Sequence, residues 1–250
     1  QMKARSPWVL SLTEPPATRL KLFCFPHAGG GGSAYARWPS KVPRDVHVVP
    51  VQLPGRENRY SEPAPPSPAA LVMAAAAGIP FGDGPFAFFG HSMGAAVAFE
   101  VTRVLHRAGR PLPRLLIASS CAAPQIGFGH VRLHEATGDE LIRQLRMYGT
   151  SEAVLSNQEL LELTVPGIRN DSRLVNGYRY DPGEPLPVPI AVYHGDRDTT
   201  VPGPLERWGE LTSAGFSIRV HRGGHMYLHP GDDAFFAALA GDLAAAVPPN

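Results

Sequence analysis

The chain has 250 residues, of which 44% are hydrophobic and 18% charged, and its formal net charge at pH 7 is +1. This length and composition predict one globular domain over residues 1–250 and exclude a disordered chain. The near-zero charge gives no electrostatic basis for binding nucleic acid. The longest apolar stretch, residues 71–79, is too short to span a bilayer, so the sequence predicts no membrane partner.

Strand-like runs alternate with helical segments along most of the chain. This alternation predicts an α/β fold, with a mostly parallel sheet covered by helices on both faces. The strand-like runs are residues 8–12, 20–25, 46–51, 86–89, 115–120, 189–194 and 216–221. Amphipathic or alanine-rich helices are expected at residues 69–78, 93–108 and 232–247.

A glycine-rich loop follows the strand-like run 20–25. It reads Pro26-His27-Ala28 and continues with four glycines, residues 29–32. Glycines let a backbone approach a ligand closely, and the loop resembles the HGGG type that supplies an oxyanion donor in α/β-hydrolases. A phosphate-binding loop is the alternative, but neither a G-x-G-x-x-G pattern nor a Walker lysine fits. We therefore assign one backbone oxyanion donor to Ala28.

The segment Gly90-His91-Ser92-Met93-Gly94 fits the pattern G-x-S-x-G, between a strand-like run and a helix of small residues. This context predicts the nucleophile elbow of an α/β-hydrolase fold, which lifts a serine hydroxyl above the sheet edge. Gly90 and Gly94 are needed because a side chain there would collide with the neighbouring strand or helix. Ser92 is the candidate nucleophile, and the amide of Met93 is the other candidate oxyanion donor. The alternative is an ordinary glycine turn with a surface serine.

The sequence has no strand-like run between about residues 124 and 188. Thr137–Glu140 and Ser156–Glu159 have capping-box spacing and predict two helix starts, and Pro166 predicts a third helix that ends near Tyr178. Such an insertion indicates a lid that excludes water and shapes a substrate pocket, with added scaffold as the alternative. Its apolar side chains would line an acyl tunnel or pack the lid; they include Leu145, Met147, Tyr148, Leu155 and Leu160.

A carboxylate is expected on the loop after the strand-like run 189–194. An acid there lies at the sheet edge beside the expected serine, where it can orient a histidine base. Asp196 and Asp198 are both candidates. Asp196 directly follows a glycine and suits a turn, so we favour Asp198. The other position for the acid, residues 119–124, contains none.

The base is expected on the glycine-rich loop after the last strand-like run, where His225 follows two glycines. His221, within the strand pattern, and His229, before a proline, are the alternatives. The two cysteines, Cys24 and Cys121, lie in or at the end of predicted strands, and buried thiols favour a reducing compartment. With no hydrophobic region of signal-peptide length at the N-terminus, we expect a cytoplasmic protein.

Five segments occur in order along nearly the whole chain. They are Phe25–Gly30, Gln52–Arg59, Gly90–Gly94, Gly195–Asp198 and Gly224–His225. Together they resemble the free-standing type II thioesterases of polyketide and nonribosomal peptide synthesis. Leu53–Glu57 is the most discriminating part, because general α/β-hydrolases do not need it.

The resemblance implies Ser92, Asp198 and His225 as a catalytic triad. It also implies hydrolysis of acyl thioesters from the phosphopantetheine arms of acyl or peptidyl carrier proteins, which clears aberrant or stalled groups from a synthase. This mechanism needs no metal and no cofactor. A chain-releasing thioesterase or macrocyclase, a small-ester esterase and a carrier-binding module with an idle triad are the alternatives.

Arg56 and Arg59 allow two interpretations. Their charges hold the loop after the Pro54-Gly55 turn through local pairs, or they meet a phosphate or an acidic carrier protein.

Overall fold

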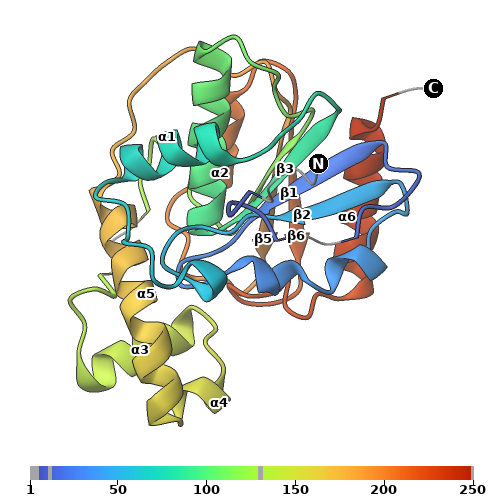
Figure 1. Ribbon diagram of the computed structural model, residues 1–250. Helices are drawn as coiled ribbons and strands as arrows, with labels where there is room; N and C mark the ends of the chain where they lie inside the picture. The colour runs from blue at the N-terminus through green and yellow to red at the C-terminus, as the bar shows by residue number, and fades with distance from the viewer. Residues whose placement is uncertain (1–5, 11–12, 129–131, 249–250) are drawn as a thin grey trace.

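The computed structural model describes residues 6–10, 13–128 and 132–248, and a parallel sheet of six strands runs through its centre (Figure 1). The strands are β1 (Leu20–Phe25), β2 (Val46–Pro50), β3 (Phe86–His91), β4 (Leu116–Ser119), β5 (Ile190–Gly195) and β6 (Phe216–His221), and they lie in the order β2-β1-β3-β4-β5-β6. Every neighbouring pair is parallel, so the carboxyl ends of the strands meet at one edge. The predicted parallel sheet is confirmed.

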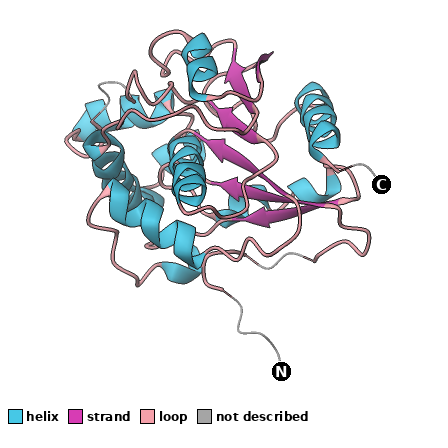
Figure 2. Ribbon diagram, turned by 90° about the horizontal axis from the view of Figure 1, so that it is seen from above, coloured by secondary structure: helices cyan, strands magenta, loops and turns pink. Residues whose placement is uncertain are grey.

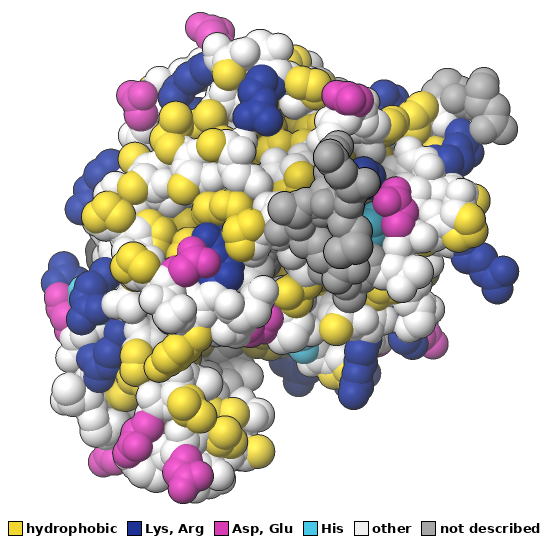
Figure 3. Space-filling view, viewed as in Figure 1, with side chains coloured by type: hydrophobic (Ala, Val, Ile, Leu, Met, Phe, Trp, Pro, Cys, Tyr) yellow, Lys and Arg dark blue, Asp and Glu magenta, His cyan; other side chains and the backbone are white. Residues whose placement is uncertain are grey.

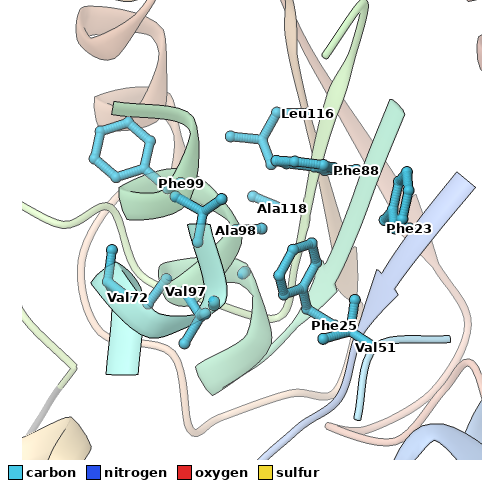
Figure 4. Close-up of a cluster of buried hydrophobic side chains, with 14 of the residues drawn as sticks. Phe23, Phe25, Val51, Val72, Phe88, Val97, Ala98, Phe99, Leu116 and Ala118 are labelled. Carbon is cyan, nitrogen blue, oxygen red and sulfur yellow. The ribbon is translucent and has the colours of Figure 1, made fainter. Parts of the chain in front are cut away.

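Helices cover both faces of this sheet (Figure 2). They are α1 (Pro68–Gly78), α2 (Met93–Arg107), α3 (Gly138–Met147), α4 (Glu152–Leu155), α5 (Gln158–Gly177) and α6 (Asp233–Ala246). Phe23 and Phe25 of β1 point toward α1 and α2 (Figure 4), whereas the alternate residues Leu22 and Cys24 belong to the core on the α6 face. Each face therefore has its own apolar core.

Both cysteines are buried and free, as the sequence predicts. Cys24 lies in the core on the α6 face and Cys121 in the core on the α1 and α2 face, so the sheet separates them. In the described part of the chain, no helix is both long and apolar enough to cross a membrane.

The predicted strand over residues 8–12 is not formed in the described residues, and residues 11–12 lie outside them. Val9 makes a single antiparallel bridge with Val51, just beyond β2. Trp8 instead packs into the core on the α1 and α2 face, with its ring against Gly78. Burial of this large side chain holds the segment beside residues 50–52, where the Leu10 amide donates to the Pro50 carbonyl at 3.0 Å and the Gln52 amide to the Trp8 carbonyl at 2.8 Å.

The insertion between β4 and β5 contains α3, α4 and α5, which project from the body of the molecule (Figure 1). The predicted helix start at Pro166 is wrong, because α5 runs through this residue without a break. Apolar residues on both sides, Val165 and Ile168, pack against one cluster, and this packing outweighs the intrinsic cost of an interior proline. Asn157, whose side chain accepts from the Leu160 amide, caps α5.

Candidate active site

Ser92 lies between β3 and α2 in a strained backbone conformation, with φ 55° and ψ −122°. A non-glycine residue at positive φ costs free energy and persists only where its surroundings enforce it. The Ser92 amide donates to the Ser119 carbonyl at 2.8 Å, and the Ser92 carbonyl accepts from the Ala95 amide at 3.0 Å. These bonds tie the turn to the end of β4 and to the first turn of α2.

The two glycines of the turn permit close approach of neighbouring backbone. A Cβ atom at Gly90 would lie 2.4 Å from the Ala95 Cα, and one at Gly94 would lie 2.2 Å from the Phe25 carbonyl oxygen. Both distances are far inside van der Waals contact. The predicted collisions are therefore confirmed, with helix α2 at Gly90 and with strand β1 at Gly94.

Asp198 and His225 form a buried pair at the same edge. His225 Nδ1 lies 2.9 Å from Asp198 Oδ2, and both residues are buried. Thr200 donates to the other carboxylate oxygen from its amide at 2.9 Å and from its hydroxyl at 2.6 Å. Burial raises the pKa of Asp198, but hydrogen bonds from His225 and Thr200 and the charge of His225 outweigh it and hold that pKa well below its usual range. The carboxylate therefore stays ionised.

The alternative acid and bases have other partners. Asp196 Oδ1 accepts from the Gly223 amide at 2.8 Å, which joins the loops after β5 and β6 and confirms its predicted structural role. His221 stacks on Tyr227 with ring centroids 5.3 Å apart, and His229 packs against His27 and Tyr35. Of the three histidines, the structure brings His225 to Asp198.

Further histidines surround this pair, and sequence reasoning assigned them no function. The His91 ring lies 5.1 Å from the His225 ring, and His91 Nδ1 lies 2.8 Å from the Ser119 hydroxyl. Burial is the main cause that lowers the pKa of His91 well below 6.5 and that of His27 to about 3, and the nearby histidines lower both further. Both rings are therefore neutral at pH 7.

A cavity of about 300 Å³ opens beside Ser92 and His225. Ala28 and Met93, the predicted oxyanion donors, line it together with residues of the insertion. Among the apolar residues singled out in the insertion, Leu145 and Tyr148 line the cavity. Leu155 packs with Leu145 inside the insertion. Met147 and Leu160 are exposed, so the structure places neither in a tunnel.

Arg56 and Arg59 are both paired within the protein. Arg56 donates to the Gly30 carbonyl at 2.9 Å and to Asp171 of α5 at 2.7 Å. Arg59 donates to the Gln52 carbonyl at 2.8 Å and pairs with Glu62. Arg59 thus makes the local pair that the first interpretation predicts, whereas the partner of Arg56 lies 115 residues away.

Comparisons with known proteins extend over nearly the whole chain. The family described as "Thioesterase domain" matches residues 20–244. The gramicidin S biosynthesis protein GrsT of Aneurinibacillus migulanus is 36% identical over 225 residues, which are 89% of this chain and 88% of GrsT. RedJ, the thioesterase from the prodiginine pathway in Streptomyces coelicolor, superimposes with a TM-score of 0.83 at 33% identity, covering 91% of this chain and 87% of RedJ. BorB, a type II thioesterase from the borrelidin biosynthetic cluster, gives 0.81 at 31% identity over 98% of each chain.

Proposed function

This chain belongs to the thioesterase family and has the α/β-hydrolase fold, and from that premise we propose that it hydrolyses acyl thioesters on the phosphopantetheine arms of acyl or peptidyl carrier proteins. Its reaction class is thioester hydrolysis. Relatives that it matches over most of their length are named for gramicidin S, prodiginine and borrelidin biosynthesis. In this proposal the enzyme removes aberrant or stalled acyl groups from a polyketide or nonribosomal peptide synthase.

One observation carries the proposed mechanism. The His225–Asp198 pair lies at the cavity that also contains Ser92, and Ser92 is held in a strained turn at the start of α2. A serine hydroxyl is a weak nucleophile until a base takes its proton, and a histidine fixed by a carboxylate is such a base. In the proposed mechanism Ser92 is the nucleophile, His225 the general base and Asp198 the group that orients His225.

The reaction then proceeds in two halves. Ser92 attacks the thioester carbonyl while His225 accepts the hydroxyl proton, and the amides of Ala28 and Met93 stabilise the oxyanion. The C–S bond breaks, and His225 returns its proton to the departing pantetheine thiolate. Water, deprotonated by His225, attacks the acyl-enzyme, and Ser92 regains the proton. None of these steps calls for a metal or a diffusible cofactor.

The cavity favours short acyl groups over a long chain that must fold back and cyclise. Its volume of about 300 Å³ is at the lower end of the roughly 300–1,000 Å³ common for ligand pockets. Residues 124–188 serve as the lid in this proposal, because Leu145, Tyr148 and Ile168 from this segment line the cavity. The two buried free thiols support a cytoplasmic location.

The proposal is tested by comparing one short acyl group on a carrier protein, on N-acetylcysteamine and as a simple ester. We expect kcat/KM to be at least about tenfold higher on the carrier, since contacts with the arm and carrier position a distant carbonyl. Equal efficiency on the ester would favour the esterase. Efficient cyclisation of a long linear chain would favour the macrocyclase.

The role of Ser92 has a separate test. A fluorophosphonate should add its phosphonyl mass to the peptide that contains Ser92, and Ser92→Ala should lose this label together with turnover. A labelled Ser92→Ala protein, or one with near wild-type turnover, would remove Ser92 from the mechanism.

A further inference from the structure

A buried ion pair connects α5 to the glycine-rich loop after β1. The side chains of Asp171 and Arg56 are 2% and 11% exposed, and Arg56 Nη2 lies 2.7 Å from Asp171 Oδ1. The other carboxylate oxygen of Asp171 accepts from the Gly29 amide at 2.7 Å, while Arg56 Nη1 donates to the Gly30 carbonyl at 2.9 Å. Charged groups this deeply buried need such partners, so the pair and the loop stabilise one another.

These bonds fix the peptide groups around Ala28. The peptide that carries the Ala28 amide has the His27 carbonyl at its other end, and this carbonyl accepts from the Gly30 amide at 2.9 Å. The next peptide carries the Gly29 amide, which Asp171 holds. Gly29 has a φ of 76°, a conformation that a flexible glycine leaves easily unless it is held. Asp171 therefore holds the peptide group that follows Ala28, and Arg56 holds the carbonyl of Gly30.

The face of α5 that holds the loop also forms a wall of the cavity. Ile168, Asp171, Ser172 and Val175 follow the i, i+3, i+4, i+7 spacing of one helix face, and all except Asp171 line the cavity. Ile168 packs on the loop so closely that a Cβ atom at Gly29 would lie 2.3 Å from its Cγ1. The loop is thus seated against the helix that the acyl group would touch.

Residues 52–59, which include the discriminating Leu53–Glu57, hold the other end of the loop. Gln52 Oε1 accepts from the Gly32 amide at 2.9 Å, and Gln52 Nε2 donates to Glu57 at 2.7 Å. Arg56 lies in the same segment and reaches α5. Residues 52–59 therefore lie between the loop and the insertion and contact both.

We propose that Asp171 and Arg56 are positioning residues that aim the Ala28 amide at the oxyanion, so that the oxyanion hole is complete only when α5 is seated on the loop. This inference rests on the proposed roles of Ser92 and Ala28. It links the insertion to the rate of acyl transfer through three hydrogen bonds rather than through contacts with the substrate alone.

The test compares Asp171→Asn, Arg56→Met and the double variant Asp171→Leu/Arg56→Met with the wild type, using an acyl-N-acetylcysteamine thioester. We expect each single variant to lose about 10- to 100-fold in kcat with KM within about threefold, because a whole oxyanion donor is worth about 10²- to 10³-fold and here it is misaligned, not removed. The affinity for an acyl trifluoromethyl ketone, which forms an oxyanion adduct, should fall by the same factor.

The double variant separates positioning from stability. It leaves no unpaired buried charge, so its Tm should recover toward the wild type, whereas kcat should stay low. Asp242→Asn is the matched control, because Asp242 likewise joins an arginine, Arg219, to a second donor, the Tyr193 hydroxyl, on the far side of the sheet. Asp242→Asn should leave kcat and ketone affinity unchanged.

Two results would overturn the inference. One is a double variant whose kcat recovers together with its Tm. The other is a set of single variants whose ketone affinity equals that of the wild type. A wild-type protein without thioesterase activity, or one that the ketone does not inhibit, would instead contradict the proposed function.

Discussion

The cavity lies between two regions that are built differently. The sheet edge, which carries Ser92, Asp198 and His225, rests on extensive cores on both faces of the sheet. The insertion has a separate cluster whose buried members are Leu133, Leu145 and Leu155. Segments with few buried apolar contacts open at a lower free-energy cost than the core of the same protein. The sheet edge is thus suited to hold reacting groups in place and the insertion to move.

Hydrophobic side chains are exposed on both regions, on the lobe that contains α3, α4 and α5 and on the body of the molecule (Figure 3). Leu160 and Leu163 of α5 are 38% and 62% exposed. Part of the apolar side-chain surface of the insertion therefore faces solvent, and this part does not stabilise the packing of the insertion.

The largest expected effect belongs to the acid at the sheet edge. Asp198→Asn should lower kcat by about 10⁴-fold, because a neutral amide neither selects the productive histidine tautomer nor stabilises the imidazolium. Asp196→Asn, on the same loop, should cost far less, since Asp196 bonds to the Gly223 amide and not to His225. Steady-state kinetics of both variants gives the comparison, and a more damaging Asp196→Asn would reverse the two roles.

A second prediction compares a glycine from each region. Gly94→Ala should destabilise the protein by about 1–3 kcal/mol or more, because its Cβ would overlap the Phe25 carbonyl oxygen of β1. Gly167→Ala, in α5, meets nothing within 4 Å and should stabilise by roughly 0.5–1 kcal/mol through helix propensity. Denaturant unfolding measures both changes. Equal tolerance at the two positions would contradict the rigid packing inferred for the elbow.

The same difference explains what the sequence could predict. The elbow, the acid and the base follow from short patterns, because Gly90, Gly94 and the ends of parallel strands restrict the backbone locally. The identification of Asp198 and His225 needed only their order and their position after a strand. In the structure His225 lines the cavity, and its Nδ1 lies 2.9 Å from Asp198 Oδ2.

The insertion could not be predicted in this way. The path of α5 through Pro166 depends on packing of Val165 and Ile168, which no local pattern reveals. The Arg56–Asp171 pair joins residues 115 positions apart, so nothing in either segment indicates the other. The bridge between Val9 and Val51 likewise depends on the packing of Trp8 into the core on the α1 and α2 face. Long-range contacts decide these features, and the sequence patterns do not contain them.

A third prediction concerns the small core of the insertion. Leu145→Ala removes a side chain that is 1% exposed and should loosen α3 to α5 by about 2 kcal/mol, the lower limit for a buried leucine. If the insertion opens on its own, limited proteolysis within residues 138–177 should become about 30-fold faster while global unfolding shifts little. Leu116→Ala, in the sheet core, should instead lower global stability. A global loss in both variants would show that the two regions unfold together.

The smallest effect per side chain, at most about 2 kcal/mol for each, comes from the neutral histidines at the sheet edge. Burial lowers the pKa of His27 from the usual 6.5 to about 3, so the ring stays neutral in the fold while the unfolded chain binds a proton below pH 6.5. The unfolded state then holds more protons, and the free energy of unfolding falls as the pH drops from 6.5 toward 3. Between pH 7 and pH 5 this amounts to at most about 2 kcal/mol for His27.

His91 should also lower the free energy of unfolding as the pH drops, because burial and the nearby His225 and His27 lower its pKa as well. Acid should therefore weaken the sheet edge, whereas the described insertion contains a single histidine, His134. The measurement is denaturant unfolding of the wild type, His27→Gln and the control His106→Gln at pH 7 and pH 5. Since His106 is exposed on α2, its variant should keep the wild-type difference between the two pH values, and His27→Gln should reduce it. An unchanged difference in His27→Gln would mean that His27 is not held neutral in the fold, and that the acid sensitivity arises elsewhere.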